Sequence, residues 1–196
     1  MSGKRERPDA FTMAKLDWAP WIETVTDIGL SEPDLEAVFE RASNARNSPY
    51  FATLALDLPA LVQRTGLFNT TMRSPGGASN AERELAATAT SRVNGCVYCA
   101  SVHAQRYVQY AKRTEMMQRL LDDGVRIPID DPREQAIVNF AVRLTEDPAG
   151  LNASDIQPLR DAGLTELEIY DVAQSAAMFA WANRLMQTLG EGVYPE

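Results

Sequence analysis

Several features are scarce or missing in this sequence. Its 196 residues include one histidine and two cysteines. No apolar run approaches the roughly 18 residues that a membrane-spanning helix needs, and the charged start of the chain lacks the hydrophobic core of a secretory signal. Lysine and arginine, 19 in all, are outnumbered by 27 aspartates and glutamates, so the net charge is −8 and disfavours a nucleic-acid surface. We therefore expect a cytoplasmic protein with no membrane and no nucleic-acid partner.

Signals for nucleotide binding and for β-structure are missing as well. Without a glycine-rich phosphate loop or a dinucleotide fingerprint, NAD(P)H is not expected as a direct reductant, and we expect no cofactor. Hairpin signals and strand–helix alternation are absent, whereas capping residues that start helices recur, so the predicted class is all-α. We expect a disordered tail over residues 1–12 and a single all-helical domain over residues 13–196. Predicted helices begin near Ser31, Ser48, Asp57, Ser79, Cys96, Thr114, Asp131, Asn152 and Thr165.

The two cysteines and the histidine lie within eight positions, in the segment Cys96-Val-Tyr-Cys99-Ala-Ser-Val-His103. Asn94-Gly95 before this segment is expected to end one helix, and the segment itself is predicted to start the next. Three residues along a helix place the two cysteine Cα atoms about 5 Å apart, within disulfide range. His103 follows Cys99 by four residues and lies on the same helix face. The pattern predicts a vicinal dithiol beside a base.

The first turn of a helix favours a thiolate, because unpaired backbone N–H groups and the positive end of the helix dipole gather there. Such positions lower the pKa of a cysteine thiol. Cys99 is the expected attacking thiol because it shares a face with His103, and Cys96 would then close the disulfide. A buried, inert cysteine pair is the alternative interpretation.

A zinc site is a second alternative. The two cysteines and His103 offer three ligands where a structural zinc site needs four, so an acidic residue or water would have to complete it. We expect no metal. A c-type haem is excluded, because Ala100 and not histidine follows the CxxC motif.

Two glutamates occupy the first turns of the helix before the dithiol. Glu82 is expected to form a capping box with Ser79, whereas Glu84 is free to point elsewhere. On the sequence alone, Glu84 is a candidate catalytic residue or an ordinary partner of the helix dipole.

This stretch resembles the alkylhydroperoxidase D / carboxymuconolactone decarboxylase superfamily, and within it the peroxidase-related branch. The family motif is Glu, eleven residues, Cys, two residues, Cys, three residues, His, and the chain matches it at Glu84, Cys96, Cys99 and His103. Further similarity extends over roughly residues 30 to 192 and includes Ala136 to Pro148 and Leu159 to Glu166.

The resemblance implies an alkylhydroperoxidase D-like helical bundle with the CxxC at the N-terminus of a core helix, assembled as a dimer, trimer or hexamer. It also implies reduction of hydroperoxides. Cys99 would attack the peroxide, His103 and Glu84 would move the proton, and Cys96 would resolve the oxidised Cys99. A thiol, thioredoxin-like or lipoyl-bearing protein would return the electrons.

The sequence departs from alkylhydroperoxidase D itself at Tyr98, where that protein has a second histidine between the cysteines. A tyrosine hydroxyl can pass a proton but is a poor base near neutral pH. Tyr98 is therefore a candidate relay member or a packing residue. The decarboxylases of the superfamily act on a lactone acid without a CxxC motif, so both cysteines favour thiol chemistry here.

Three functions remain open from the sequence. The leading hypothesis is a thiol-dependent peroxidase. The second is a disulfide oxidoreductase or redox sensor with little peroxidase activity, and the third is a non-catalytic helical assembly protein. Apolar residues near the motif could line a peroxide pocket or belong to the core or a subunit interface; they are Tyr107, Tyr110, Met178, Phe179 and Trp181.

Overall fold

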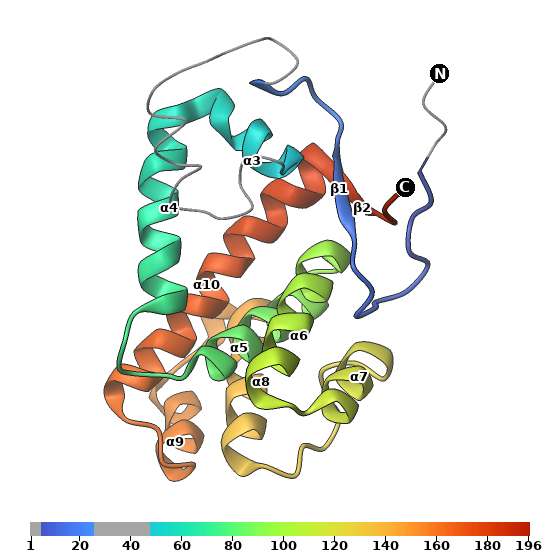
Figure 1. The fold of residues 1–196 in the computed structure, drawn as a ribbon. Helices are drawn as coiled ribbons and strands as arrows, with labels where there is room; N and C mark the ends of the chain where they lie inside the picture. Colours follow the sequence, from blue (N-terminus) through green and yellow to red (C-terminus); the bar gives the residue numbers. More distant parts are fainter. Residues whose placement is uncertain (1–4, 26–47) are drawn as a thin grey trace.

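The computed structural model of the protein describes residues 5–25 and 48–196, so the helix start predicted at Ser31 lies outside the described residues. Helices are the dominant element of the described part, beside one small two-stranded sheet, which confirms the predicted all-α class (Figure 1). Its α-helices are α3 (Pro49–Leu54), α4 (Leu58–Arg73), α5 (Asn80–Val93), α6 (Val97–Ala111), α7 (Thr114–Asp122), α8 (Pro132–Glu146), α9 (Ala153–Asp161) and α10 (Glu166–Leu189). Two short 3-10 turns, Ala55–Asp57 and Pro148–Gly150, complete the helical elements.

Helices begin where the capping residues predict. Ser79 accepts a hydrogen bond from the Glu82 backbone N–H at 3.3 Å, and the Glu82 carboxylate accepts one from the Ser79 backbone N–H at 2.7 Å. This reciprocal pair satisfies two backbone donors at the start of α5. The same arrangement starts α10 at Thr165, and an aspartate side chain caps α8 at Asp131. Local sequence therefore fixes these boundaries.

Helix α5 lies at the centre of the bundle and packs against α6, α8 and α10. Its residues Leu85, Ala86 and Ala89 are completely buried. The two alanines let the neighbouring helix backbones approach closely, and burial of the apolar face supplies the main stabilising free energy. In Figure 1, α4 runs alongside the long helix α10. The dithiol segment thus starts a helix that packs directly on the most buried element.

A small antiparallel sheet joins the two ends of the chain and was not predicted. Strand β1 (Asp17–Pro20) pairs with β2 (Gly190–Val193), with Trp18 opposite Gly192. The Trp18 ring is buried, and its Nε1–H donates to the Met186 carbonyl oxygen at 3.1 Å. Strands of four residues separated by most of the chain carry too little periodicity to be recognised in a sequence. The sheet fastens the N-terminal segment to the end of α10.

The described part of the N-terminal segment has specific contacts. The Tyr194 backbone N–H donates to the Glu6 carbonyl oxygen at 2.9 Å, and the Arg92 guanidinium carbon lies 4.1 Å from the centre of the Phe11 ring. The division into a tail over residues 1–12 and a domain over residues 13–196 stays a prediction.

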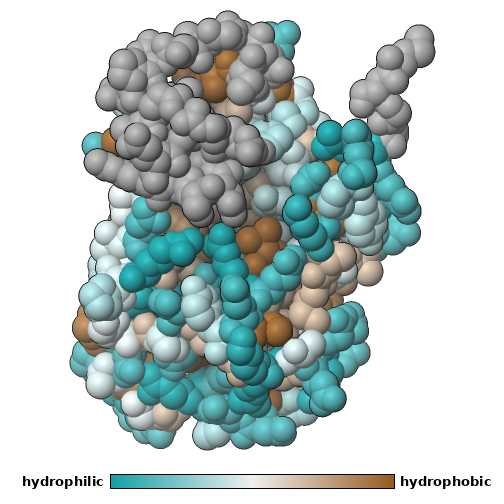
Figure 2. All heavy atoms as spheres, in the orientation of Figure 1, coloured by the Kyte–Doolittle hydropathy of each residue, from teal (hydrophilic) through white to brown (hydrophobic). Residues whose placement is uncertain are grey.

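Hydrophilic residues dominate the lower half of the face in Figure 2, over α7, α8 and α9. Within residues 5–25 and 48–196, no helix combines the length and hydropathy needed to cross a membrane.

Candidate functional site

The break before the dithiol has the predicted geometry. Helix α5 ends at Val93, and Gly95 takes the left-handed conformation with φ of 77°, which glycine adopts at little cost. Cys96 is the N-cap of α6 and lies one residue before its first turn, whereas Cys99 lies inside that turn. The structure therefore brings both cysteines to the positive end of α6.

The two thiols are free, and each cysteine is only 3% exposed. The Cys99 thiol lies 3.3 Å from the Met186 sulfur and can donate to it. The pKa of Cys96 is lowered, first because the Cys99 thiol hydrogen-bonds to it and also because the Asn183 amide donates to it. The same interaction with Cys96, together with burial, raises the pKa of Cys99. The first negative charge of the reduced pair therefore resides on Cys96.

Asn183 of α10 anchors the dithiol segment from the opposite side. It is completely buried, its side-chain oxygen accepts from the Asn94 amide at 3.0 Å, and its amide donates to the Ser91 hydroxyl at 3.1 Å. It thereby connects the end of α5, the Asn94-Gly95 break and the cysteines. Asn183-Arg184 is one of the stretches that resemble the family, but the sequence assigned the Asn183 side chain no role.

His103 pairs with Glu84 across the contact between α6 and α5. The His103 Nδ1 atom contacts the Glu84 Oε2 atom, and both side chains are buried. Burial lowers the pKa of His103 despite the nearby carboxylate, so the imidazole is neutral at pH 7. With Nδ1–H donating to the carboxylate, the Nε2 atom is left as the proton acceptor. In the described residues the partners of the Cys99 thiol are Met186 and Cys96, and His103 is not among them.

Arg106 is a further member of this cluster that the sequence analysis missed. Its Nη1 atom lies 4.0 Å from the Glu84 Oε1 atom, on the opposite carboxylate oxygen from His103. Arg106 follows His103 by three residues on α6, so the two share a helix face. This spacing of three residues from His103 is the sequence signal that could have identified Arg106.

Tyr98 lies half-buried between the cysteines and the small sheet. A Cβ atom on Gly192 of β2 would lie 3.2 Å from the Tyr98 Cβ atom, so the strand backbone packs tightly over this residue. Burial, the main cause, raises the pKa of Tyr98 to about 12. The hydroxyl therefore keeps its proton near neutral pH. Tyr98 packs against the cluster that contains both cysteines, and its role in a proton relay stays a hypothesis.

Aromatic rings from three helices surround the dithiol and the imidazole. The Phe179 ring lies 4.1 Å from the His103 ring, centre to centre, and 6.0 Å from the Phe68 ring. Tyr50 belongs to the same buried cluster as Cys96 and Cys99. Arg64 of α4 stacks on Phe68, with the guanidinium carbon 4.4 Å from the ring centre. Of the other apolar residues considered from the sequence, Tyr110 and Trp181 are exposed.

The described residues contain no group of three or more His, Cys, Asp or Glu side chains placed to hold a metal ion. His103 uses one ring nitrogen on Glu84, and the cysteines contact each other, Asn183 and Met186.

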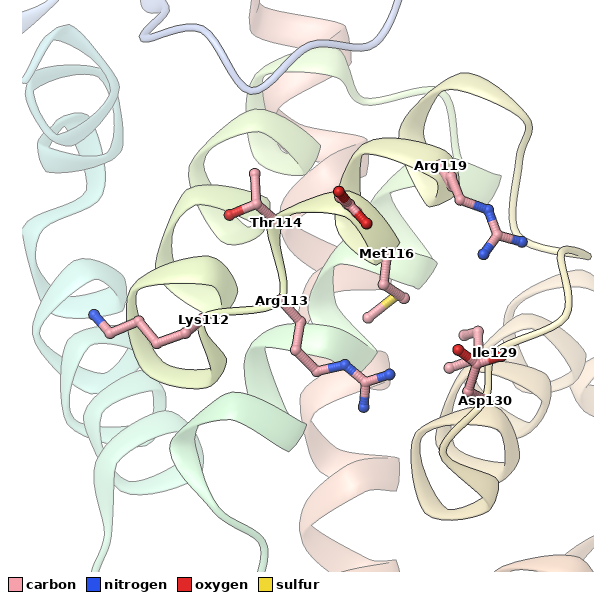
Figure 3. Close-up of a pocket in the computed structure, with 8 residues that line it drawn as sticks. Lys112, Arg113, Thr114, Met116, Arg119, Ile129 and Asp130 are labelled. Carbon is pink, nitrogen blue, oxygen red and sulfur yellow. The ribbon is translucent and has the colours of Figure 1, made fainter.

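A pocket of about 440 Å³ lies at the opposite end of α6 (Figure 3). It lies roughly 20 Å along the helix from Cys99, from the rise of 1.5 Å per residue. Arg113 in this pocket is paired with Glu134 at 2.9 Å. None of the predicted site residues lines the pocket, which is formed by Lys112, Arg113, Thr114, Glu115, Met116, Arg119, Ile129 and Asp130.

Comparisons with known proteins agree on one fold. The profile of the Carboxymuconolactone decarboxylase family matches residues 59–143. The structure resembles an alkylhydroperoxidase AhpD core, an uncharacterized peroxidase-related protein from Ralstonia eutropha JMP134, with a TM-score of 0.69 and 25% identity over 82% of this chain and 88% of that one. A peroxidase-related protein from Silicibacter sp. TM1040 has a TM-score of 0.70 and 22% identity over 87% and 91% of the two chains.

The debrominase Bmp8 also has this fold. Its apo structure has a TM-score of 0.67 and 19% identity, over 90% of this chain and 91% of that one. A second Bmp8 structure, of a cysteine-to-alanine variant, contains 2,3,4-tribromopyrrole. The sequence has no significant match among curated proteins. One helical scaffold is thus shared by peroxidase-related proteins and a debrominase.

Proposed function

We propose, from the premise that this chain belongs to the alkylhydroperoxidase D-like and carboxymuconolactone decarboxylase superfamily, that it is an enzyme that reduces organic hydroperoxides. The reaction would oxidise the Cys96–Cys99 dithiol to a disulfide. The observation that carries the proposal is the buried dithiol at the start of α6, on the same helix as a neutral His103 held by Glu84. A thiol nucleophile with a base nearby is the arrangement that thiol redox catalysis requires.

Cys99 is proposed as the attacking residue. Its thiol first transfers its proton to the Cys96 thiolate, to which it is hydrogen-bonded. The Cys99 thiolate then displaces alkoxide from the hydroperoxide and becomes a sulfenic acid. The departing alkoxide takes up a proton from solvent, which replaces the proton that Cys96 had released on ionising; His103 Nε2 and Glu84 form the proposed route for it.

Cys96 then attacks the sulfur of the sulfenic acid. The sulfur–sulfur bond forms, hydroxide leaves, and the second thiol proton completes a water molecule. One turnover therefore converts hydroperoxide and two thiols into alcohol, water and a disulfide. Close placement of the resolving thiol limits further oxidation of Cys99.

The dithiol is regenerated, in this proposal, by thiol–disulfide exchange with a thioredoxin-like or lipoyl-bearing protein. The same proposal includes a cytoplasmic location, because such reductants keep thiols reduced there. It also includes a homo-oligomeric assembly.

Steady-state consumption of cumene hydroperoxide with dihydrolipoamide as reductant tests this function. Cys99→Ser should abolish consumption. Cys96→Ser should stop turnover and leave a sulfenic acid on Cys99 that dimedone traps. Melting temperatures close to that of the wild type would show that both variants are folded. Wild-type turnover by Cys99→Ser would overturn the proposal, and a sulfenic acid trapped on Cys96 in that variant would reverse the two roles.

Reductive debromination is a second candidate, favoured by the aromatic rings around the dithiol. Phe179, Phe68 and Tyr50 can contact a flat aromatic substrate. An aryl bromide and two thiols would give the unsubstituted ring, hydrogen bromide and the same disulfide. Bromide release from a bromopyrrole at a rate above that of hydroperoxide reduction would favour this function over the first.

A further inference from the structure

Arg64 stands apart from the other arginines in the described part of the chain. It is half-buried, yet no carboxylate of the described residues lies within the 4.0 Å of an ion pair, and its Nε atom has no hydrogen-bond partner. Every other arginine that is buried or half-buried there pairs with a carboxylate or donates to a carbonyl oxygen. A partly buried cation without an acceptor is costly unless a ligand supplies one.

The guanidinium is held in a defined orientation by aromatic rings. Its carbon lies 4.4 Å from the centre of the Phe68 ring, 5.4 Å from that of Phe51 and 5.9 Å from that of Tyr50. Stacking uses the flat face of a guanidinium and leaves the N–H groups at its edge available for in-plane hydrogen bonds. The α3 and α4 rings thereby orient Arg64 for binding a planar oxyanion.

A second unpartnered polar group lies beside it. The Tyr50 side chain is 6% exposed, and its hydroxyl lies beside the Arg64 guanidinium and has no hydrogen-bond partner of good geometry among the described residues. Burial raises its pKa, so the hydroxyl is a neutral donor. The Trp18 ring packs against the edge of Tyr50 at 5.4 Å, which fixes the tyrosine ring. Two converging donors among aromatic side chains are typical of a small-molecule binding site.

This pair of donors lies near the thiol chemistry. Tyr50 shares a buried cluster with Cys96, Cys99 and Met186. The Arg64 charge is close enough to oppose protonation of His103 and to favour the Cys99 thiolate. A substrate whose reacting atom meets Cys99 would therefore extend toward Arg64 and Tyr50.

We propose that Arg64 and Tyr50 form a receptor for an oxyanion, a carboxylate or phenolate, on an organic substrate with an aromatic body. The kinetic test of this inference rests on the proposed dithiol function. The binding test does not, because it depends only on the geometry of Arg64 and Tyr50. Phe51 and Phe68 would contact the apolar body of the substrate, and the two donors would bind its anionic group. The receptor selects substrates and takes no part in breaking the O–O bond.

A matched pair of substrates separates binding of the anion from effects on the thiol. Cumene hydroperoxide is neutral, and its para-carboxylate derivative differs only in the anionic group. Arg64→Met should reduce kcat/KM for the carboxylate about tenfold or more relative to cumene hydroperoxide, because a charge-assisted pair is lost. Tyr50→Phe, which keeps the ring packing, should reduce the same ratio by a few-fold. Arg126→Met is the control, since Arg126 is exposed and pairs with Glu146 on the surface.

Equal losses on both substrates in Arg64→Met would overturn the receptor and assign the charge of Arg64 to the thiol chemistry. Calorimetry with 4-isopropylbenzoate and 4-isopropylbenzamide, which cannot be reduced, provides the independent arm. Preferential binding of the benzoate that is lost in Arg64→Met supports the receptor even if no hydroperoxide is consumed. Indistinguishable binding of the benzoate by wild type and Arg64→Met contradicts it.

Discussion

The Nδ1 atom of His103 contacts the Oε2 atom of Glu84, and the two side chains are only 5% and 4% exposed. This buried pair orients the only imidazole of the chain, on the helix that begins at the dithiol. The carboxylate fixes the ring and its tautomer, so that the Nε2 atom is the available proton acceptor. The pair connects α5 to α6 at the point where the proposed chemistry needs a base.

Replacement of Glu84 tests whether this orientation matters to the reaction. Glu84→Gln keeps the size of the side chain but removes the charge that accepts the His103 proton. We expect kcat for hydroperoxide reduction to fall at least about tenfold, within the range that positioned acid–base groups contribute. Steady-state kinetics with cumene hydroperoxide measure the change.

Glu82→Gln is the matched control on the same helix. Glu82 caps α5 and pairs with Arg133, away from the dithiol. Its replacement should lower the melting temperature slightly and leave kcat unchanged. Equal rates for Glu84→Gln and wild type would reduce Glu84 to a structural partner of the histidine.

The two thiols should titrate separately in the reduced protein. The pKa of Cys96 is lowered chiefly by the hydrogen bond from the Cys99 thiol, and the pKa of Cys99 is raised. Thiolate absorbance at 240 nm should therefore rise in two steps, one on each side of the ordinary pKa of cysteine. Cys99→Ala removes the main donor and should raise the pKa of Cys96. A single step for both thiols, or an unchanged pKa of Cys96 in Cys99→Ala, would contradict the assigned charge distribution.

The single histidine makes its titration directly observable. Burial lowers the pKa of His103 below the roughly 6.5 of an unfolded histidine. As pH falls below about 6.5, the unfolded chain binds a proton that the folded chain does not yet bind, so the free energy of unfolding decreases. This loss continues down to the lower folded pKa. The imidazole proton resonance should give a midpoint below 6.5, and His103→Gln should lack this part of the pH dependence of stability. A midpoint at or above 6.5 would show that Glu84 outweighs burial.

A buried ion pair outside the site should dominate the local stability of the α5–α10 contact. The Arg83 side chain is 2% exposed and donates to Asp171 at 2.7 Å, and Asp171 also accepts from the Ala78 backbone N–H. Asp171→Ala leaves a buried arginine without its counterion and should cost about 3 kcal/mol in the free energy of unfolding. Urea denaturation provides the measurement.

The comparison for that variant is Glu146→Ala. Its partner Arg126 has a side chain that is 76% exposed, so loss of this pair should cost less than about 1 kcal/mol. Equal losses in the free energy of unfolding for Asp171→Ala and Glu146→Ala would contradict the claim that burial strengthens the Arg83–Asp171 pair.

Local sequence signals predicted the helical class and most helix starts, because capping residues such as Ser79, Asp131 and Thr165 act within one turn. The pairing of His103 with Glu84 came from the family motif, since the two lie on different helices. Contacts that depend on packing between distant segments could not be predicted. Met186 and Arg64 reach the dithiol region from α10 and α4, and no periodic pattern marks either residue.

The sequence could not predict which of the two cysteines has the lower pKa, for a related reason. Both were expected at a helix N-terminus, where either thiol is favoured as an anion. The difference between them arises first from the hydrogen bond between the two thiols, in which Cys99 is the donor, and also from the donation of the Asn183 amide of α10 to Cys96. Those contacts exist only in the folded chain.

The most direct test of the central proposal is the intact mass of the reduced protein before and after one equivalent of cumene hydroperoxide. A dithiol–disulfide cycle predicts a loss of about two hydrogens per chain, with the hydroperoxide consumed in step. An unchanged mass with the hydroperoxide unspent would contradict peroxidase function. In that case disulfide exchange with a protein substrate would be the next reaction to measure.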